Sequence, residues 1–388
     1  MGSIINKLRD EEQKKALNNW ASAGFCGSII AGTGFGKSRC AVLACDYVIK
    51  HDSDAKVIIL VPTVQLQDQF KEEFHKWELG HCLDNIEILC YQSAYKLKNE
   101  YYDLVLCDEV HLGLSLQYRK FFIHNKYDSL LCMTATLPEE EEYEELLSKI
   151  APTIYTITLD ECVNLGIVAP YKIYCTPISL TNSERRKYKE INNQFVYYKY
   201  QLGEIDAFDE ANRILKDYTS NSTDRENAAG FYKCIRERKK IIDFAVNKIA
   251  AFKLLVASNA DKRILGFSGA NDFTDKLTES VSPLAMSYHS KKTKKQREIA
   301  LKAFKEGDIN ILCSTKALNQ GLDIPDANVG IICGITSKAL SMVQRVGRLI
   351  RFQEGKTGEV HILYVENSQE EKWLKKATQS LNNIIWKN

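Results

Sequence analysis

The feature that most constrains the fold is a glycine-rich segment, A-G-T-G-F-G-K-S at residues 31–38. It follows an apolar run at 27–31 and precedes a helical pattern at 39–49. A strand, a tight loop and a helix in this order form the first half of a βαβ unit, from which parallel sheets are built. Glycines let the backbone wrap closely around a polyphosphate with its N–H groups pointing inward, and the helix adds its positive N-terminal end. The segment therefore predicts a phosphate-binding loop in an α/β lobe.

Two residues at the end of this loop have distinct predicted roles. We expect the ammonium group of Lys37 to reach the β and γ phosphates of a nucleotide, and the hydroxyl of Ser38 to ligate Mg²⁺. Position 31 is Ala where the general pattern has Gly, and glycine-rich turns also occur for purely conformational reasons, so a turn without a ligand is the alternative at this point. The other residues expected to contact the nucleotide are Gly32, Thr33, Gly34 and Gly36.

A pair of acidic residues follows a second apolar run. Residues 104–107 read as a buried strand, and Asp108 and Glu109 stand at its carboxyl end, where parallel sheets bind ligands. Asp108 suits a role in holding Mg²⁺, and Glu109 suits a general base that orients and deprotonates an attacking water. The alternative, two acids that merely cap a loop, is disfavoured by the phosphate loop upstream. We therefore predict that Lys37, Asp108 and Glu109 act together in catalysis.

The alternation of short apolar runs with longer amphipathic segments occurs twice, so the sequence predicts two α/β lobes with parallel sheets. At 388 residues the chain also exceeds what one hydrophobic core usually serves. A polar stretch rich in Lys, Arg and Tyr between 181 and 253 has helical patterning and is expected to be a helical insertion or bridge. The predicted strands of the first lobe are 27–31, 56–61, 86–90, 104–108 and 129–134. Those of the second lobe are 262–268, 285–289, 310–314, 329–333 and 359–365, with helices such as 293–306 between them.

Composition restricts the compartment and the partners. Lys and Arg total 52 against 50 Asp and Glu, so the formal charge of +2 gives no whole-protein attraction for a polyanion, and any nucleic-acid path must be local. Twelve cysteines are scattered, mostly within apolar runs, and close pairs such as Cys40 and Cys45 lack CxxC spacing. This favours buried reduced thiols and predicts no structural metal. Since no run approaches the roughly 18 apolar residues of a membrane span, we expect a soluble, cytoplasmic protein, in the host cytoplasm if viral.

In order along the chain, several segments resemble motifs of the superfamily 2 helicases and translocases. The segment D-E-V-H at 108–111 resembles the D-E-x-H box of that family. Near the start, Gln13 follows Leu8 and Arg9 as in the family's L-R-x-x-Q element, here one residue longer, whose Gln reads the adenine edge. The other matches are V-P-T at 61–63 with Leu66 and Gln69, Y-Q-S at 91–93 and T-A-T at 134–136.

The resemblance implies roles for residues outside the phosphate loop. In the family, the motifs at 61–63 and 91–93 contact the nucleic-acid backbone, and the motif at 134–136 links hydrolysis to strand movement. The implied nucleic-acid contacts in the first lobe are Pro62, Thr63, Gln92 and Ser93. The implied coupling residues are His111, Thr134 and Thr136.

The second lobe contains two further matches. The segment 315–325 resembles the family's T-x-x-x-x-x-G-x-D-x-P motif, which implies that Gly321 and Asp323 approach the ribose and phosphates and that Thr315 contacts nucleic acid. Ser268 is a further candidate contact.

The segment 344–351 matches Q-R-x-G-R-x-x-R. Arg348 and Arg351 are three apart, hence on one helical face, and are implied to be arginine fingers; Gln344 and Arg345 set the geometry of the motif. A basic cluster either extends the nucleic-acid path or is a solvated helix start; it consists of Lys291, Lys292, Lys294, Lys295 and Arg297.

The resemblance spans nearly the whole chain and implies two tandem RecA-like lobes with a helical bridging segment. The expected divisions are an ATP-binding lobe at 1–160, a linker and bridge at 161–255 and a second lobe at 256–388. ATP and Mg²⁺ are the implied cofactors, and hydrolysis in the interlobe cleft would move the chain along DNA or remodel DNA in replication, recombination or repair. DNA repair and phage branch-migration helicases are the most similar branch. An RNA helicase and a nucleotide-gated nucleic-acid clamp with slow turnover are the alternatives; we expect a monomer, with a protein partner possible for recruitment.

Overall fold

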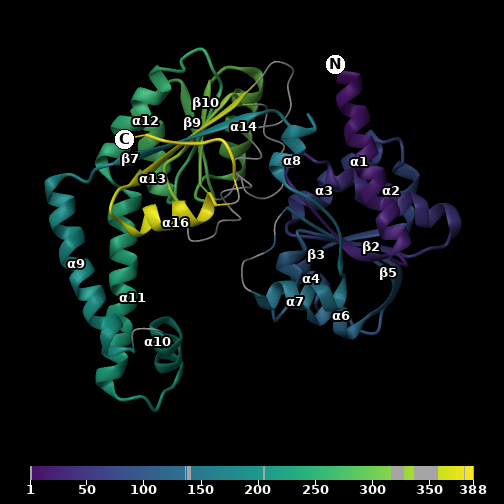
Figure 1. Ribbon diagram of the computed structural model, residues 1–388, viewed down its shortest axis with the longest axis horizontal. Helices are drawn as coiled ribbons and strands as arrows, with labels where there is room; N and C mark the ends of the chain where they lie inside the picture. Colours follow the sequence, from purple (N-terminus) through teal and green to yellow (C-terminus); the bar gives the residue numbers. More distant parts are fainter. Residues whose placement is uncertain are drawn as a thin grey trace.

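The structure is a computed structural model and describes residues 2–135, 137, 141–203, 206–315, 327–335, 357–379 and 381–387. Within these residues the chain forms two α/β lobes, each built on its own parallel sheet, and a helical extension (Figure 1). The predicted fold class, an α/β protein with two parallel-sheet lobes, is confirmed.

The first sheet has the strand order β3-β2-β4-β5-β1-β6, with every pair of neighbours parallel. The strand β2 is fully buried because Val57, Ile59 and Val61 face one apolar core while Ile58 and Leu60 face another. The five predicted strands are confirmed, and β6 is an additional edge strand. The strands are β1 (Cys26–Ala31), β2 (Val57–Val61), β3 (Ile86–Cys90), β4 (Tyr101–Asp108), β5 (Lys126–Thr134) and β6 (Thr153–Ile157).

Helices connect these strands and cover the sheet. The longer ones are α1 (Gly2–Ser22), α2 (Lys37–His51), α3 (Val64–Lys76) and α7 (Glu141–Ile150). The shorter ones are η1 (Gly80–Asn85), α4 (Tyr91–Ala94), α5 (Val110–Gly113), α6 (Lys120–His124) and α8 (Leu159–Asn164). Because parallel strands all end at one edge, the segments that follow β1, β2, β3, β4 and β5 meet there.

The second sheet has the order β13-β7-β12-β11-β8-β10-β9, again with parallel neighbours. All five predicted strands of this lobe are present, with β7 and β13 in addition. The strands are β7 (Tyr171–Ile178), β8 (Ile264–Phe267), β9 (Ala285–Tyr288), β10 (Ile311–Ser314), β11 (Val329–Ile332), β12 (Gly358–Val365) and β13 (Ile384–Trp386). The helices within the described residues of this lobe are α12 (Val246–Ala257), α13 (Asn271–Ser280), α14 (Lys294–Glu306) and α16 (Gln369–Ala377).

The position of β7 corrects the expected boundary at residue 256. This strand pairs with β12 along its whole length, so the second sheet already includes a segment that the sequence assigned to the linker. The apolar signal of β7 is interrupted because several of its side chains are only partly buried and Pro177 lies inside it.

The central polar stretch folds into a helical arm, formed by α9 (Asn182–Gln201), α10 (Ala207–Lys216) and α11 (Ser222–Asp243). Figure 1 shows α9 and α11 side by side, with α10 at their far end, extending from the second lobe. The arm has its own small core around Phe231. Its ring stacks on that of Phe195 with the ring centroids 5.2 Å apart, and it meets the Phe208 ring edge-on with the centroids 5.0 Å apart. The helical prediction is confirmed, but the arm is an insertion and not a bridge, because β7 precedes it and α12 follows it within the second lobe.

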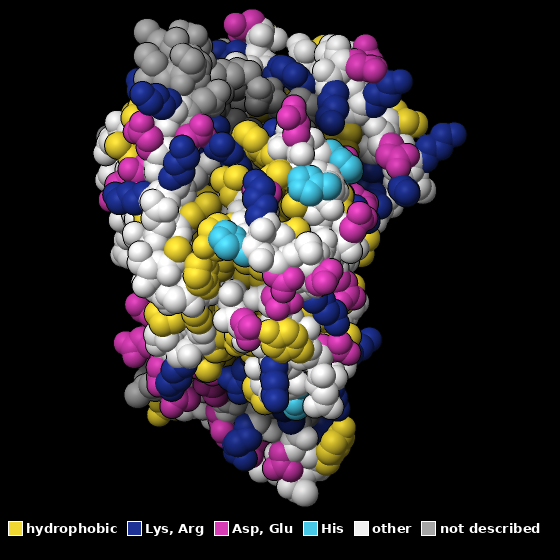
Figure 2. All heavy atoms as spheres, turned by 90° about the vertical axis from the view of Figure 1, so that its right-hand side faces the viewer, with side chains coloured by type: hydrophobic (Ala, Val, Ile, Leu, Met, Phe, Trp, Pro, Cys, Tyr) yellow, Lys and Arg dark blue, Asp and Glu magenta, His cyan; other side chains and the backbone are white. Residues whose placement is uncertain are grey.

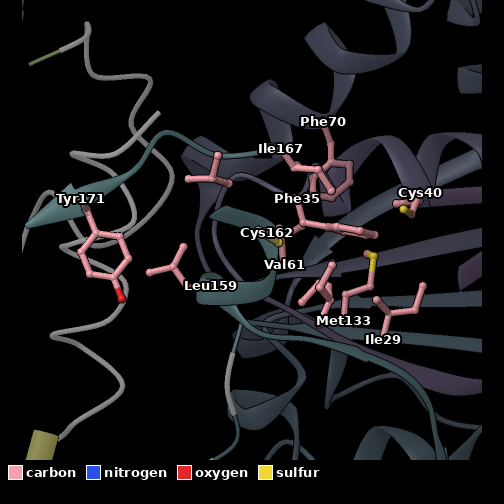
Figure 3. Close-up of a cluster of buried hydrophobic side chains, with 14 of the residues drawn as sticks. Ile29, Phe35, Cys40, Val61, Phe70, Met133, Leu159, Cys162, Ile167 and Tyr171 are labelled. Atoms are coloured by element: carbon pink, nitrogen blue, oxygen red, sulfur yellow. The ribbon is translucent and has the colours of Figure 1, made fainter. Parts of the chain in front are cut away.

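The segment between β6 and β7 connects the two sheets and packs on the glycine-rich loop. Arg9 donates to the carbonyl of Ile167 at 2.8 Å, and the Tyr171 hydroxyl donates to Asp160. Figure 3 shows Phe35 of the loop in a buried cluster that also contains Val61 of the sheet and Ile167 of the connection. The Gly32 N–H donates to the carbonyl of Ile157 at 2.9 Å, so the end of β6 also contacts the loop.

The distribution of charged side chains and the state of the cysteines agree with the amino-acid composition. Basic and acidic side chains are interspersed over the face shown in Figure 2, in keeping with the near balance of charges. All twelve cysteines are free thiols, and eleven of them are buried. None of the helices in the described ranges combines the length and the apolar character that crossing a membrane would require.

Candidate nucleotide site

The glycine-rich loop has a geometry that requires glycine, as its positions 32 and 36 illustrate. Gly36 stands immediately before α2 with φ +91° and ψ 43°, in the left-handed region. A Cβ on Gly32 would lie 2.9 Å from both the backbone nitrogen and the Cα of Leu159, because the start of α8 closes on the loop. The first turn of α2 then directs the positive end of its dipole toward the loop.

Polar groups of this loop suit an anionic ligand. The hydroxyl of Thr33 is buried and has no hydrogen-bond partner within the described structure. The Nζ atom of Lys37 donates to the carbonyl of Ala31 at 2.8 Å, a neutral acceptor that a phosphate oxygen would outcompete. Together with the N-terminus of α2, these groups fit the polyphosphate of a nucleotide.

Asp108 ends β4, at the same edge of the sheet as the loop. Burial and the negative charge of Glu109 raise the pKa of Asp108 to about 7, whereas the positive charge of Lys37 acts in the opposite direction. A cation bound beside this carboxyl group would restore its ionised form. Since Mg²⁺ prefers hard oxygen ligands, the Asp108 carboxylate and the Ser38 hydroxyl are a donor set that fits it.

Glu109 is held in a strained backbone conformation by a hydrogen-bonded network. Its φ of 51° and ψ of 53° lie in the left-handed region, which costs a residue other than glycine about 1–3 kcal/mol. Thr134, buried at the end of β5, donates to Glu109 Oε2 at 3.2 Å. His111 Nδ1 lies 3.1 Å from the Thr134 hydroxyl and 3.4 Å from Glu109 Oε2. The three predicted residues are thus in direct contact.

Gln13 lies against the loop, as the sequence suggested, together with an arginine that the sequence analysis missed. The Gln13 amide is buried and donates to the carbonyl of Phe35 at 2.7 Å. Its oxygen accepts from Arg39 at 2.8 Å, and Arg39 also pairs with Asp10 and covers the Trp77 ring at 4.2 Å. The position of Arg39 directly after the loop was the only signal for it. The structure also adds Tyr91, whose hydroxyl donates to the Asp108 carbonyl at 2.8 Å.

The four candidate nucleic-acid contacts of the first lobe follow β2 and β3 at their carboxyl ends. Gln92 and Ser93 are exposed on α4. Thr63 precedes α3, and its buried hydroxyl has no hydrogen-bond partner in the described part of the chain, while Pro62 is buried. Gln92, Ser93 and Thr63 therefore share the sheet edge that carries Glu109.

The two candidates of the second lobe are buried. Thr315 follows β10, and its hydroxyl donates to the Asn271 side chain at 3.0 Å. Ser268 is fully buried; its hydroxyl donates to the carbonyl of Ala270 at 2.8 Å and lies 2.6 Å from the Thr274 hydroxyl. Ser268 thus stabilises the start of α13 with a buried hydroxyl, and its role as a nucleic-acid contact stays a prediction.

The basic cluster after β9 is partly neutralised. Lys291 pairs with Asp272 at 2.6 Å and Lys292 with Asp275 at 3.0 Å. Although burial raises the pKa of Asp275, hydrogen bonds from His289, Ser287 and Lys292 hold it at about 2. These two lysines therefore already have anionic partners.

The remaining predicted site residues lie outside the described residues. They are Thr136, Gly321, Asp323, Gln344, Arg345, Arg348 and Arg351.

Two family models match consecutive parts of the chain. Residues 6–139 match the model described as "Type III restriction enzyme, res subunit", and residues 247–353 match "Helicase conserved C-terminal domain". The first match contains the glycine-rich loop, Glu109 and Thr134, and the second contains Arg348 and Arg351.

Similar proteins share nearly the full length of this chain. The "DNA 3'-5' translocase XPB2" of Sulfurisphaera tokodaii is 26% identical over 89% of this chain and 79% of its own length. The "DNA 3'-5' helicase XPB" of Mycobacterium tuberculosis is 24% identical over 89% of this chain, which spans 58% of that relative. The helicase domain of Pyrococcus furiosus Hef has the same fold, with a TM-score of 0.57, 16% identity and coverage of 94% of this chain and 98% of that one. With two parallel-sheet lobes, a nucleotide-binding loop and matches of this extent, the chain belongs to the superfamily 2 helicases, which are ATP-dependent enzymes.

Proposed function

We propose that this chain is a DNA helicase or translocase that hydrolyses ATP between its lobes to move along or remodel DNA in replication, recombination or repair. The observation that carries the proposal is the cluster of side chains at the carboxyl edge of the first sheet. There Glu109 contacts both Thr134 and His111. The positive charge of Lys37 opposes the burial that raises the pKa of Asp108. The choice of DNA is supported by relatives whose names specify a DNA translocase and a DNA helicase, each matching 89% of the chain.

In this proposal the first lobe binds the nucleotide and prepares the water. The loop N–H groups and Lys37 hold the phosphates, Gln13 faces the adenine, and Ser38 and Asp108 hold Mg²⁺, which offsets negative charge on the phosphates. Glu109 accepts a proton from the attacking water, while the hydrogen bond from Thr134 fixes the orientation of the carboxylate.

The second lobe completes the site in this proposal. Gly321 and Asp323 approach the ribose and phosphates, and Gln344 sets the geometry of its motif. Arg348 and Arg351 neutralise charge that develops on the γ-phosphate. Thr136 joins Thr134 and His111 in coupling hydrolysis to movement.

The DNA backbone would cross the carboxyl edges of both sheets. Hydroxyl and amide groups that bind phosphates and sugars give affinity without reading sequence. The proposed contacts are Pro62, Thr63, Gln92, Ser93 and Thr315.

The helical arm offers a further contact that could select the form of DNA. Tyr200 is 71% exposed and Tyr218 is 93% exposed, and bases stack on such rings. We propose that the chain acts as a monomer, with this arm or a protein partner setting the substrate.

The test is the ATPase rate of the full chain, measured without nucleic acid and with single-stranded DNA, duplex or forked DNA, and RNA. Glu109→Gln provides the background, and Glu72→Gln, which alters an exposed carboxylate on α3, is the matched control. We expect DNA to stimulate turnover in the wild type and the control only. Stimulation by RNA alone would identify an RNA helicase, and background turnover throughout would indicate a clamp.

A further inference from the structure

Three side chains with metal-binding atoms converge far from the nucleotide site. Asp46 lies on α2, about 14 Å along the helix from Lys37, and His81 and Cys82 lie on η1. One donor atom from each residue lies within 4.8 Å of the other two. Asp46 comes from a different element than the adjacent His81 and Cys82, so the spacing of cysteines in the sequence did not indicate the cluster.

The distances within this Asp46–His81–Cys82 cluster match a tetrahedral metal. The Cys82 Sγ and His81 Nε2 atoms are 3.6 Å apart. A tetrahedral Zn²⁺ ion with bonds of about 2.3 Å to sulfur and about 2.1 Å to nitrogen would separate these atoms by about 3.6 Å. The side chains therefore need little rearrangement to share one ion.

One carboxylate oxygen of Asp46 accepts no hydrogen bond from the described residues. Its Oδ2 atom accepts from Lys50 at 2.7 Å, but Oδ1 is buried and has no hydrogen-bond partner within the described residues. The Asp46 side chain is only 13% exposed, so an unsatisfied oxygen there is costly. A cation held by Oδ1 would satisfy it.

The environment of the thiol also suits a cation. Cys82 is fully buried, and its sulfur lies beside the His81 ring and the Asp46 carboxylate. A metal ion would displace the thiol proton to solvent and hold the thiolate. His81 is exposed, which gives the ion an entry path.

We propose that Asp46, His81 and Cys82 form a Zn²⁺ site, with a water molecule as the fourth ligand. Thiolate and imidazole ligands select zinc over Mg²⁺, which prefers oxygen. The ion would cross-link the second half of α2, the helix that begins at the phosphate loop, to η1. This site is independent of the proposed catalytic mechanism.

Direct binding to the full-length chain tests the proposal. The metal-free, reduced protein is titrated with Zn²⁺ against a chromophoric chelator, and with Co²⁺ while the thiolate-to-cobalt absorption band is followed. We expect one Zn²⁺ per chain, a thiolate band with Co²⁺, and a rise in Tm with Zn²⁺.

Substitutions locate the ion. His81→Ala changes an exposed side chain and Cys82→Ser a buried one, and each should abolish the high-affinity equivalent and the cobalt band. Lys50→Met should tighten binding, since it removes a competing positive charge from Asp46. The matched controls His124→Ala, an exposed histidine, and Cys26→Ser, a partly exposed thiol, should bind as the wild type does.

Three results would overturn the proposal. The first is a wild-type chain that binds no Zn²⁺, and the second is binding that persists in the folded His81→Ala variant. The third is a cobalt complex without a thiolate band. Circular dichroism of each variant separates loss of the site from loss of the fold.

Discussion

Asp108 is a strongly perturbed acid in the nucleotide site. Its carboxyl group is partly covered at the end of β4 and stands next to Glu109 in sequence, so two negative charges would share one edge of the sheet. Burial and this neighbour disfavour ionisation, and the charge of Lys37 and a hydrogen bond from the Glu109 backbone oppose them. A bound cation would therefore stabilise the ionised form of Asp108.

The stability of the nucleotide-free protein should consequently depend on Asp108 and on pH. Unfolded Asp108 has a pKa of about 3.9, whereas the folded group keeps its proton until about pH 7. The folded state binds more protons between these values, so stability falls as pH rises from about 4 to about 7. Asp108→Asn should raise the free energy of unfolding at pH 8 by on the order of 1–3 kcal/mol, and by much less at pH 4.

Urea denaturation without nucleotide or Mg²⁺ at both pH values measures this difference. Asp68→Asn, which alters an exposed carboxylate on α3, should have the same small effect at both. An equal effect of Asp108→Asn at pH 4 and pH 8 would contradict the raised pKa.

At the scale of elements, a buried ion pair joins two helices and two strand ends of the second lobe. Lys248 of α12 and Glu370 of α16 are both fully buried, with Nζ 2.8 Å from Oε2. Lys248 also donates to the carbonyl of Cys333 at 2.8 Å, and the Glu370 carboxylate accepts from the backbone of Ile335 and Val365. The pair fixes the ends of β11 and β12 against both helices.

Removal of one partner should be costly because the other charge stays buried. Lys248→Met should reduce the free energy of unfolding by about 3–5 kcal/mol. The double variant with Glu370→Met should lose less than the sum of the two single changes. Chemical denaturation of the four proteins closes this double-mutant cycle, and strictly additive losses would show that the two charges do not interact.

The helical arm should unfold independently of the lobe that carries it. Phe231 is fully buried in a core made of arm residues, so Phe231→Ala should destabilise the arm by about 3–5 kcal/mol. Hydrogen exchange should then accelerate in α9, α10 and α11 while β8 and β12 stay protected. Tyr218→Ala, at a position 93% exposed, is the control and should leave exchange unchanged. Equal acceleration in β8 and β12 would show that the arm and the lobe unfold together.

At the scale of the whole molecule, catalysis in our proposal needs both lobes. Arg351→Ala should lower the DNA-stimulated ATPase rate by about 10³-fold or more, because an arginine finger acts on the transition state. DNA affinity should stay near the wild-type value, because the proposed contacts with the track lie elsewhere. Steady-state ATPase assays and fluorescence anisotropy with labelled DNA measure the two quantities. Wild-type turnover in this variant would remove Arg351 from the mechanism.

The fold class and the nucleotide site could be predicted from local sequence signals. The glycines before Lys37 and the apolar runs that become β2 and β4 are properties of short segments, because strand burial and loop conformation depend on neighbouring residues. The same holds for Asp108 and Glu109, whose place at a strand end follows from the run before them. These segments gave the α/β class and the nucleotide site.

Tertiary structure decided what depends on residues distant in sequence. Pairing with β12 placed β7 in the second sheet, and the contacts of Gln13 with Arg39 and of Glu109 with Thr134 join separate elements. Ser268 was a candidate nucleic-acid contact in the sequence, and only the packing against Thr274 shows that it is buried. The cluster of Asp46 with His81 and Cys82 likewise exists only because α2 and η1 pack together. The periodicity and spacing of residues reflect the conformation of a short segment. These contacts depend on how elements distant in sequence pack together, which no short segment encodes.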